Sequence, residues 1–461
     1  MGRGIQTQPC SQFLVPLQFP LMSSLFNLLG PRKAFDGGLF LPDHKSVTSR
    51  RAVELLRVDG PLHVPLTVRQ DLKTEPNVRV GDRVLKGERL SNSTSHESIA
   101  THAPTSGKIV ELSRAWTTQD GYLPCAVLEP DGREEALPQH QGWEDESLIV
   151  QLAEHGVMCS EPRAPLHSVI KEAVAAGVTD LIVNAMETEP YLTADLRMLV
   201  EEHGRIIDVT CELADALGVS RAILALPFRH RRVVKRMEAE AHGRYVEIAA
   251  MANPYPQCQP LVLVKALLDC EIAPGGRVLD KGVIVLPLAA VVQAAEALLD
   301  DRPITHTVMT VAGDAVERAG TYRVAIGTPM RHLAERVGLV GRVAKAVCGG
   351  PLTGLAMGHE EAVVTATTKA LLLFSETEPS IPVPCIHCGW CVEDCPVGID
   401  PPSLMQLESK PNCTNLEMSH LKACLDCGLC SYVCPAQLPL GETIHRTRTR
   451  FEQQREPACL T

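Results

Sequence analysis

The amino-acid sequence predicts a multidomain protein of the α/β plus β class that ends in a small cysteine-rich domain. Two cysteine runs of identical spacing lie near the C-terminus. In the middle of the chain, short apolar segments alternate with amphipathic ones, which is typical of a parallel sheet covered by helices. Segments rich in β-forming residues, Gly and Pro lie on either side of that region. At 461 residues the chain is long enough for two to four domains.

The composition is that of a globular protein, with 45% hydrophobic and 21% charged residues. A net charge of -11 argues against a nucleic-acid partner. Basic runs at 228–236 and 445–450 are either solvated faces or, alternatively, contacts with a partner. No apolar run reaches the length of about 18 residues that a membrane helix needs. The apolar stretch 13–29 is interrupted by Pro16 and Pro20, which favours a disordered or docking arm at residues 1–30 rather than a signal peptide.

Residues 31–135 are expected to form a barrel-sandwich (lipoyl-like) domain. The segments 78–90 and 100–112 read as short strands with turn glycines at Gly81, Gly87 and Gly107. A carrier domain of this fold needs a lysine in the hairpin between the halves, and the hairpin SNSTSHESIA at 91–100 has none. The sequence therefore predicts a structural copy of the fold rather than a carrier.

Residues 140–300 are expected to form a Rossmann-like parallel α/β domain. The predicted buried strands are 180–184, 205–209, 221–226, 244–249 and 282–286. The predicted helices are 193–203, 231–241 and 261–269. Short apolar strands that alternate with amphipathic helices indicate a sheet with helices on both faces.

Residues 303–375 return to β character and predict a β-grasp-like (SLBB-type) module, because 306–338 reads as strand, turn, strand and short helix. A Pro-rich linker at 376–384 leads to a cysteine domain at about 380–440. The polar residues 441–461 are expected to form a tail or a terminal helix.

The cysteine domain carries the clearest chemistry. CIHCGWCVEDCP at 385–396 and CLDCGLCSYVCP at 424–435 both follow C-x2-C-x2-C-x3-C-P. In two-cluster ferredoxins the first three cysteines of such a run hold one [4Fe-4S] cluster and the fourth holds the other cluster. This predicts one cluster on Cys385, Cys388, Cys391 and Cys434, and a second on Cys424, Cys427, Cys430 and Cys395.

Zinc is the alternative cargo, because structural zinc sites also use paired C-x2-C units. Two complete runs that both end in Cys-Pro favour iron-sulfur clusters. Trp390 could shield one cluster from water, where the second run has Leu429, or both residues could simply pack. The nine other cysteines are scattered and are expected to behave as small hydrophobic residues.

Six motifs resemble, in their order, the RnfC (RsxC) family, whose members are the C component of the Rnf electron-transport complex. They are FDGGLFLPDHK (35–45), HAPTSGKIVEL (102–112), NAMETEPYLTADLRML (184–199), the segment 311–333, GGPLTGLAMG (349–358) and the double cysteine run. The resemblance covers about residues 31–440. It implies a peripheral subunit on the cytoplasmic side of the cell inner membrane, related to the NADH-oxidising flavoprotein of respiratory complex I. It also implies an oxidoreductase (translocase) complex that couples electron flow between NADH and ferredoxin to ion translocation. Its partners are the other Rnf subunits.

The resemblance implies a flavin and nucleotide cleft along the acidic segment that contains Asn184, Glu187, Glu189 and Asp195. A structural connection between strand and helix is the alternative role of this segment. No catalytic residue is assigned.

Three segments depart from the family pattern at this cleft. The glycine-rich flavin loop, which would place backbone N–H groups against the FMN phosphate, is replaced by MCSEPRAP at 158–165, where Glu161 carries charge of the wrong sign. The stretch QCQP at 257–260 replaces Gly-Gly-Glu-Lys, and VLPLAAV at 285–291 lacks the family's Asn. The departures predict that FMN and NADH binding is weakened or absent.

The sequence thus favours an electron-transfer subunit of an Rnf-type membrane complex. Its candidate contacts with membrane partners are the arm at 13–29 and the basic run 445–450. One alternative is a soluble flavin-dependent NADH reductase related to cobalamin reductases. Another is a redox scaffold protein with a degenerate flavin site. The coupling ion, the direction of electron flow and the identity of the donor do not follow from the sequence.

Overall fold

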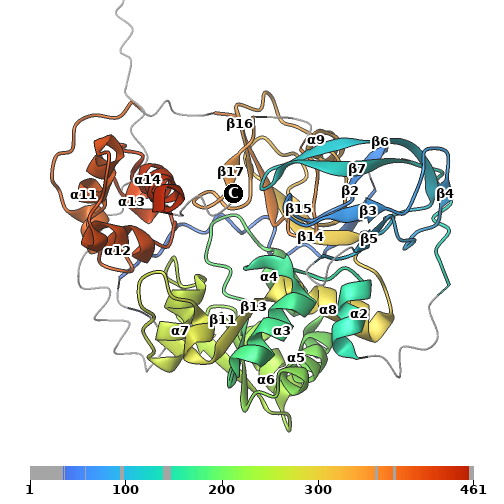
Figure 1. The fold of residues 1–461 in the computed structure, drawn as a ribbon, viewed down its shortest axis with the longest axis horizontal. Coiled ribbons are helices and arrows are strands. Elements are labelled where there is room, and N and C mark those ends of the chain that lie inside the picture. Colours follow the sequence, from blue (N-terminus) through green and yellow to red (C-terminus); the bar gives the residue numbers. More distant parts are fainter. Residues whose placement is uncertain are drawn as a thin grey trace, which may run out of the picture.

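A computed structural model describes residues 35, 37–57, 59–93, 98–138, 147–358, 362–376 and 381–455. The predicted N-terminal arm (1–30) lies outside these residues, as does part of the hairpin at 91–100. Figure 1 shows a β-rich half at the upper right, an α/β layer below it and a separate helical unit at the left.

The first part of the chain forms a small antiparallel β domain. Its main sheet has the order β2 (Leu62–Pro65), β7 (Gly121–Pro130), β6 (Gly107–Thr117) and β4 (Arg83–Val84), and β3 (Thr74–Pro76) pairs with β5 (Ser91–Ser93). Leu90, Ile109 and Leu128 are fully buried between these strands. Gly107 is required there, because a Cβ at this position would lie 2.1 Å from the carbonyl oxygen of Glu129.

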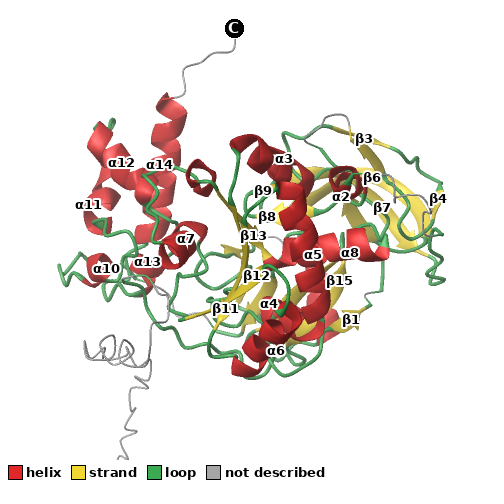
Figure 2. Ribbon diagram, turned by 90° about the horizontal axis from the view of Figure 1, so that it is seen from below, coloured by secondary structure: helices red, strands yellow, loops and turns green. Residues whose placement is uncertain are grey.

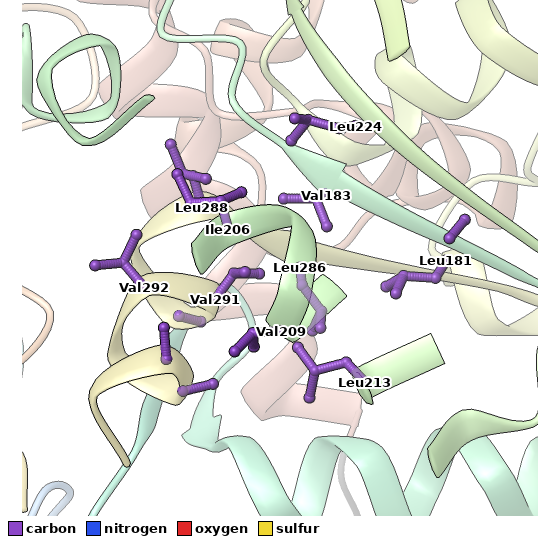
Figure 3. Packing of buried hydrophobic residues seen from close by; sticks show 14 of the residues in the cluster. Leu181, Val183, Ile206, Val209, Leu213, Leu224, Leu286, Leu288, Val291 and Val292 are labelled. Atoms are coloured by element: carbon purple, nitrogen blue, oxygen red, sulfur yellow. The ribbon is translucent and has the colours of Figure 1, made fainter. Parts of the chain in front are cut away.

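The middle of the chain is an α/β domain with a four-stranded parallel sheet in the order β12-β11-β10-β13. The strands are β10 (Asp180–Asn184), β11 (Arg221–Pro227), β12 (Val246–Met251) and β13 (Val283–Pro287). The helices are α2 (Leu148–Glu154), α3 (Leu166–Ala176), α4 (Ala194–Glu201), α5 (His203–Leu217), α6 (Arg231–Ala241), α7 (Pro260–Leu268) and α8 (Leu288–Asp300), with a 3-10 turn η2 (Val278–Lys281). Figure 3 shows Leu181 and Val183 of β10 near Ile206 and Leu213 of α5 in the main core.

One predicted strand is wrong. Residues 205–209 lie inside helix α5, and not in the sheet. The run RIIDV is rich in β-branched residues, but its buried positions continue as Thr210, Leu213 and Leu217, which is the spacing of a helix face. The helical period over 15 residues overrides the local preference of five.

A second sheet has six strands in the order β1-β15-β14-β18-β16-β17. They are β1 (Glu54–Leu56), β14 (His306–Ala312), β15 (Gly320–Ala325), β16 (Lys345–Cys348), β17 (Leu355–Ala356) and β18 (Ala370–Phe374), covered by α9 (Met330–Val337). The strand, turn, strand and helix predicted for 306–338 are present as β14, β15 and α9. Strand β1 comes from the segment before the β2–β7 domain and adds in parallel to β15, which the sequence did not predict.

The cysteine domain is helical, with α10 (Trp390–Glu393), α11 (Pro401–Met405), η3 (Gln406–Ser409), α12 (Asn415–Ala423), α13 (Leu429–Tyr432) and α14 (Leu440–Arg455). Helix α14 occupies most of the predicted tail and buries Ile444 and Phe451 in the core of this domain. Within the described residues, no helix is long and apolar enough to span a bilayer.

The basic run 445–450 lies on α14 and contacts its own domain. Arg446 donates to Glu408 at 2.9 Å, Arg448 to the carbonyl of Cys424 at 2.9 Å, and Arg450 to the carbonyl of Leu407 at 2.9 Å. These arginines therefore hold the domain together.

Candidate functional site

The two cysteine runs fold into two copies of the same turn. Residues His387 and Asp426 have φ of 54° and 53°, and the following glycines, Gly389 and Gly428, have φ of 83° and 72°. Each glycine begins a one-turn helix, α10 or α13. Glycine adopts this left-handed backbone without the steric cost that a Cβ adds.

Four thiols of the first set line one hollow. Cys385, Cys388, Cys391 and Cys434 all border it, although Cys434 comes from the second run. Burial raises the pKa of Cys391 to about 11, and the neighbouring Cys434, Cys388 and Cys385 contribute to the shift. The fourth cysteine of the second run therefore borders the same hollow as the first three of the first run.

The second set is arranged in the same crossed way. Burial raises the pKa of both Cys427 and Cys430 to about 12, and in each case Cys424 and Cys395 add to the effect. Cys395 comes from the first run. A [4Fe-4S] cluster takes four thiolate ligands, so the residue types of both sets and their crossed connection fit this group. Within the described residues, no three His, Cys, Asp or Glu side chains lie close enough together to hold a single metal ion.

The second set lies against the body of the protein. Tyr255, which is 1% exposed, donates from its phenol oxygen to the carbonyl of Cys427 at 2.5 Å. Tyr255 also exchanges two backbone hydrogen bonds with Leu39, at 2.8 and 2.9 Å. Leu39, Tyr255, Cys427 and Leu429 form one buried apolar cluster, with Leu352 packed against it.

A cluster of polar side chains lies at the carboxyl edge of the parallel sheet, after β10. Asn184 ends β10 and donates to the carbonyl of Cys258 at 2.7 Å, while its own oxygen accepts from Met186 N at 3.1 Å. Glu187 accepts from Asp195 N at 3.1 Å, and its second oxygen lies 3.8 Å from the Lys45 ammonium. Both predicted cofactor residues therefore have structural partners.

Glu189 supports the loop before β17. Its carboxylate accepts from Leu352 N at 3.1 Å and from the Thr353 hydroxyl. A Cβ at Gly350 would lie 1.9 Å from this carboxylate, so the loop approaches as closely as only glycine allows. The fourth predicted residue, Asp195, lies in the first turn of α4. Burial, followed by the charge of Glu187, raises the pKa of its carboxyl to about 7.

Lys369, which the sequence did not predict, lies near the same polar cluster. The Lys369 side chain is exposed to solvent. The protein around it would by itself lower the pKa of its ammonium, but nearby acidic groups outweigh this effect and raise the pKa. These groups are Glu161, Asp195, Cys258 and Glu189. The sequence shows only that one lysine directly precedes the apolar strand β18. Its acidic neighbours come from segments far apart in the chain, so the sequence does not indicate that they meet.

The residues at the head of α3 do not fit a flavin phosphate. The segment aligned with the flavin loop forms a hairpin of β8 (Met158–Ser160) and β9 (Arg163–Pro165). Glu161 lies at its tip, and burial raises the pKa of this carboxyl against the pull of Lys369. Arg163 is paired with Asp120, so its charge is already compensated. A phosphate would meet a carboxylate where a glycine loop would offer N–H groups.

Three family models match consecutive parts of the chain. Residues 33–133 match the RnfC barrel sandwich hybrid domain, 161–299 the Nuo51 FMN-binding domain and 384–439 a 4Fe-4S dicluster domain. The Nuo51 match makes FMN possible for the fold, whereas the hairpin and Glu161 oppose it in this chain.

Curated relatives match over most of the chain. The C component of the ion-translocating oxidoreductase complex of Edwardsiella ictaluri is 29% identical over 83% of this chain and 50% of its own length. The protein of the same name from Rhodobacter capsulatus is 29% identical over 84% and 76%, respectively. The C component of the proton-translocating ferredoxin:NAD(+) oxidoreductase complex of Clostridium ljungdahlii is 26% identical over 82% and 85%. The chain spans about half the length of the first relatives it matches.

Among solved structures, NAD+-reducing [NiFe]-hydrogenase in the H2-reduced state aligns with a TM-score of 0.46 and 15% identity, covering 67% of this chain and 61% of that chain.

The barrel-sandwich, Nuo51-like and dicluster domains, in this order, define an iron-sulfur protein built around the fold of a flavin-binding protein. Over most of its length the chain is similar to curated C subunits of ion-translocating oxidoreductase complexes, and its first domain matches the RnfC barrel-sandwich model.

Proposed function

We propose that this chain is an electron-transfer subunit of a membrane-bound, ion-translocating oxidoreductase complex, with two [4Fe-4S] clusters as its redox groups. The observation that carries the proposal is the pair of crossed thiol sets, Cys385, Cys388, Cys391 and Cys434, and Cys424, Cys427, Cys430 and Cys395. Each cluster, when bound, supplies reversible one-electron chemistry. The relatives' names support the assignment to a complex of this kind.

The two sets have different surroundings, and this difference suggests which set is accessible to another protein. The second set contacts the α/β domain through Tyr255, and Cys427 is only 8% exposed. The first set includes Cys388, which is exposed. We propose that electrons are exchanged with another protein at the first set, and that the second set is the inner cluster, which Tyr255 holds against the α/β domain.

We further propose that the protein is peripheral, on the cytoplasmic side of the inner membrane, that the other Rnf subunits hold it there, and that ferredoxin is a redox partner of the complex. The name of the Clostridium ljungdahlii relative gives NAD(+) as the other substrate of its complex. No step through a flavin is proposed for this chain, because the β8–β9 hairpin and Glu161 occupy the place of the phosphate loop.

Cofactor content tests the proposal. The chain is purified anaerobically, and iron, sulfide and flavin are counted per polypeptide. We expect about eight iron and eight sulfide, as two [4Fe-4S] clusters require, with flavin far below one per chain. Reversible reduction of both clusters by a low-potential donor, followed by EPR, is the second readout. Clusters that cannot be reduced would contradict an electron-transfer role.

A redox scaffold protein with a degenerate flavin site is the second candidate. It is favoured by the carboxylate of Glu161 at the head of α3 and by the structural partners of Asn184, Glu187 and Glu189. Stoichiometric FMN would exclude it. NADH-dependent dye reduction by the isolated chain would instead support a soluble flavin-dependent reductase.

A further inference from the structure

The two cysteine runs allow a comparison within the molecule. Because both fold into the same turn and one-turn helix, each residue of the first copy has a counterpart 39 positions later, such as Trp390 and Leu429. The same face of the two copies can therefore be compared residue by residue.

In the second copy this face is covered by the protein itself. Leu429 is 1% exposed and Ala436 is 2% exposed. The position of a Cβ on Gly428 lies 2.7 Å from the carbonyl oxygen of Leu352, so a backbone segment passes directly over this glycine. The covering surface is an apolar cluster built around Leu39 and Tyr255.

In the first copy the same face is open. Trp390 is 42% exposed and Val397 38%, and their neighbours Ile386 and Val392 are 62% and 40% exposed. Within the described residues, no atom lies within 4 Å of a Cβ placed on Gly389. We call this set, Ile386, Cys388, Gly389, Trp390, Val392 and Val397, the outer face. An exposed apolar group beside a redox site marks an interaction surface.

The acidic residues around the outer face restrict what can bind. Residues 381–409 contain Glu393, Asp394, Asp400 and Glu408 but no Lys or Arg. Arg446 of α14 pairs with Glu408, which leaves the residues next to α10 acidic. A symmetric contact between two copies would bring two acidic rims together, which is unfavourable. The rim therefore favours a different protein with a basic edge.

We propose that the outer face is the docking surface for a redox-active partner protein. The partner presents apolar side chains to Trp390 and Ile386, a backbone segment over Gly389, and basic residues to the acidic rim. Its binding reproduces, between two proteins, the contact that Leu352 and Tyr255 make with the second copy within this chain. The inference rests on the proposed function, since a partner from the same complex is the expected occupant.

Site-specific photo-crosslinking tests the surface. The full chain, affinity-tagged and expressed in its host, carries Ile386→p-benzoylphenylalanine, and the products of irradiating whole cells are identified by mass spectrometry. The control is Leu416→p-benzoylphenylalanine, which replaces a residue that is 67% exposed on α12. Figure 2 shows α10 and α12 at opposite ends of the helical domain. We expect position 386, but not 416, to crosslink to another redox protein of the complex.

Trp390→Glu gives an independent measurement. Because Trp390 is exposed, we expect the variant to keep its iron and sulfide and to lose at least tenfold in the amount of complex that co-purifies with it. Leu416→Glu is the matched control and should co-purify as the wild type does. An unchanged yield with Trp390→Glu would overturn the proposal.

Three crosslinking results would also overturn it: a link from position 386 to a second copy of this chain, a link to residues 1–34, or no link in cells where the complex is intact. If the proposed function itself were wrong, the results would differ from these three. In that case the wild-type chain itself would not co-purify with a membrane complex, and position 386 would link to a redox protein outside any such complex.

Discussion

The phenol oxygen of Tyr255 donates a hydrogen bond of 2.5 Å to the backbone carbonyl of Cys427. Tyr255 belongs to the loop after β12, and Cys427 belongs to the cysteine domain 172 residues later. This bond joins the α/β domain to the turn that presents the second set of thiols. Hydrogen-bond donors near a cluster raise its reduction potential, because they stabilise the more negative reduced state.

Tyr255→Phe should therefore shift one cluster and leave the other unchanged. We expect the potential of the cluster on the second set to fall, since the donor near Cys427 is removed, while the cluster on the first set keeps its potential. Loss of a buried hydrogen bond that leaves a carbonyl unpaired should also cost about 1–3 kcal/mol of stability. An EPR-monitored redox titration measures the first effect and chemical unfolding the second.

Tyr122→Phe is the control for this experiment, because Tyr122 lies on β7 and is 49% exposed. It should move neither potential. Equal shifts of both clusters in Tyr255→Phe would contradict the placement of Tyr255 beside the second set alone.

The sequence predicted the iron-sulfur ligands better than it predicted the contacts of the polar cluster after β10. Ligand spacing in the two runs is local, so the turn, the positive-φ glycines and the short helices follow from a few adjacent residues. Strands β10, β11 and β13 were also predictable, because each is a short apolar run between helices. The segment 205–209 was not, because its helical period appears only over the whole length of α5.

The polar cluster after β10 could not be predicted in detail, because its charged residues are far apart in the sequence and come together only in the folded chain. Lys369 comes from the segment before β18, Glu161 from the β8–β9 hairpin and Asp195 from the first turn of α4. No spacing in the sequence relates these three residues. Likewise, the partner of Glu189 is a loop more than 160 residues away, at Leu352 and Thr353.

The crossed connection of the thiols predicts which variants share a phenotype. Cys395→Ser should remove the same EPR signal as Cys424→Ser, whereas Cys434→Ser should remove the same signal as Cys385→Ser. Each variant should lose about half of the iron, because the fourth ligand of each run completes the other cluster. Iron analysis and EPR of the dithionite-reduced proteins measure both effects.

Cys413→Ser serves as the control within the same domain, because Cys413 packs against the core of this domain and lies outside both thiol sets. It should retain all the iron. If Cys395→Ser removed the signal that Cys385→Ser removes, each run would hold its own cluster and the crossed assignment would be wrong.

The charges of Glu161 and Lys369 predict how tightly this part of the protein binds an anion such as the FMN phosphate. Glu161→Gln removes one of the carboxylates that compensate Lys369, so the ammonium becomes available to a phosphate group. We expect the variant to bind FMN roughly five- to tenfold more tightly than the wild type, equivalent to about 1 kcal/mol. Quenching of flavin fluorescence measures the affinity.

The double variant Glu161→Gln with Lys369→Gln should lose this gain, since the cation that attracts the phosphate is then absent. A gain that persisted in the double variant would show that Lys369 does not contact the anion. Tight binding of FMN to the wild type would show that the β8–β9 hairpin opens for the cofactor.

Asp195 predicts a dependence of stability on pH. Burial and the charge of Glu187 raise its pKa to about 7 in the folded protein, well above the ordinary value of 3.8. The unfolded chain therefore ionises this carboxyl first, and the folded state loses stability as the pH rises from about 4 until it passes 7. Above that range the loss is complete and constant.

Asp195→Asn removes this titration. Between about pH 6 and pH 8 the wild type should lose about 1 kcal/mol more of its free energy of unfolding than the variant does. The reason is that folded Asp195 still holds its proton at about pH 6 and has lost it by about pH 8, whereas the unfolded chain is ionised throughout. Anaerobic urea unfolding followed by circular dichroism across this interval measures the difference. Parallel pH profiles for the two proteins would show that the Asp195 carboxyl is already ionised at the acidic end of the interval. In that case the attraction of Lys369 and Lys45 for the Asp195 carboxylate would outweigh the effect of burial on its pKa. The groups around Asp195 would then be charged throughout this pH range.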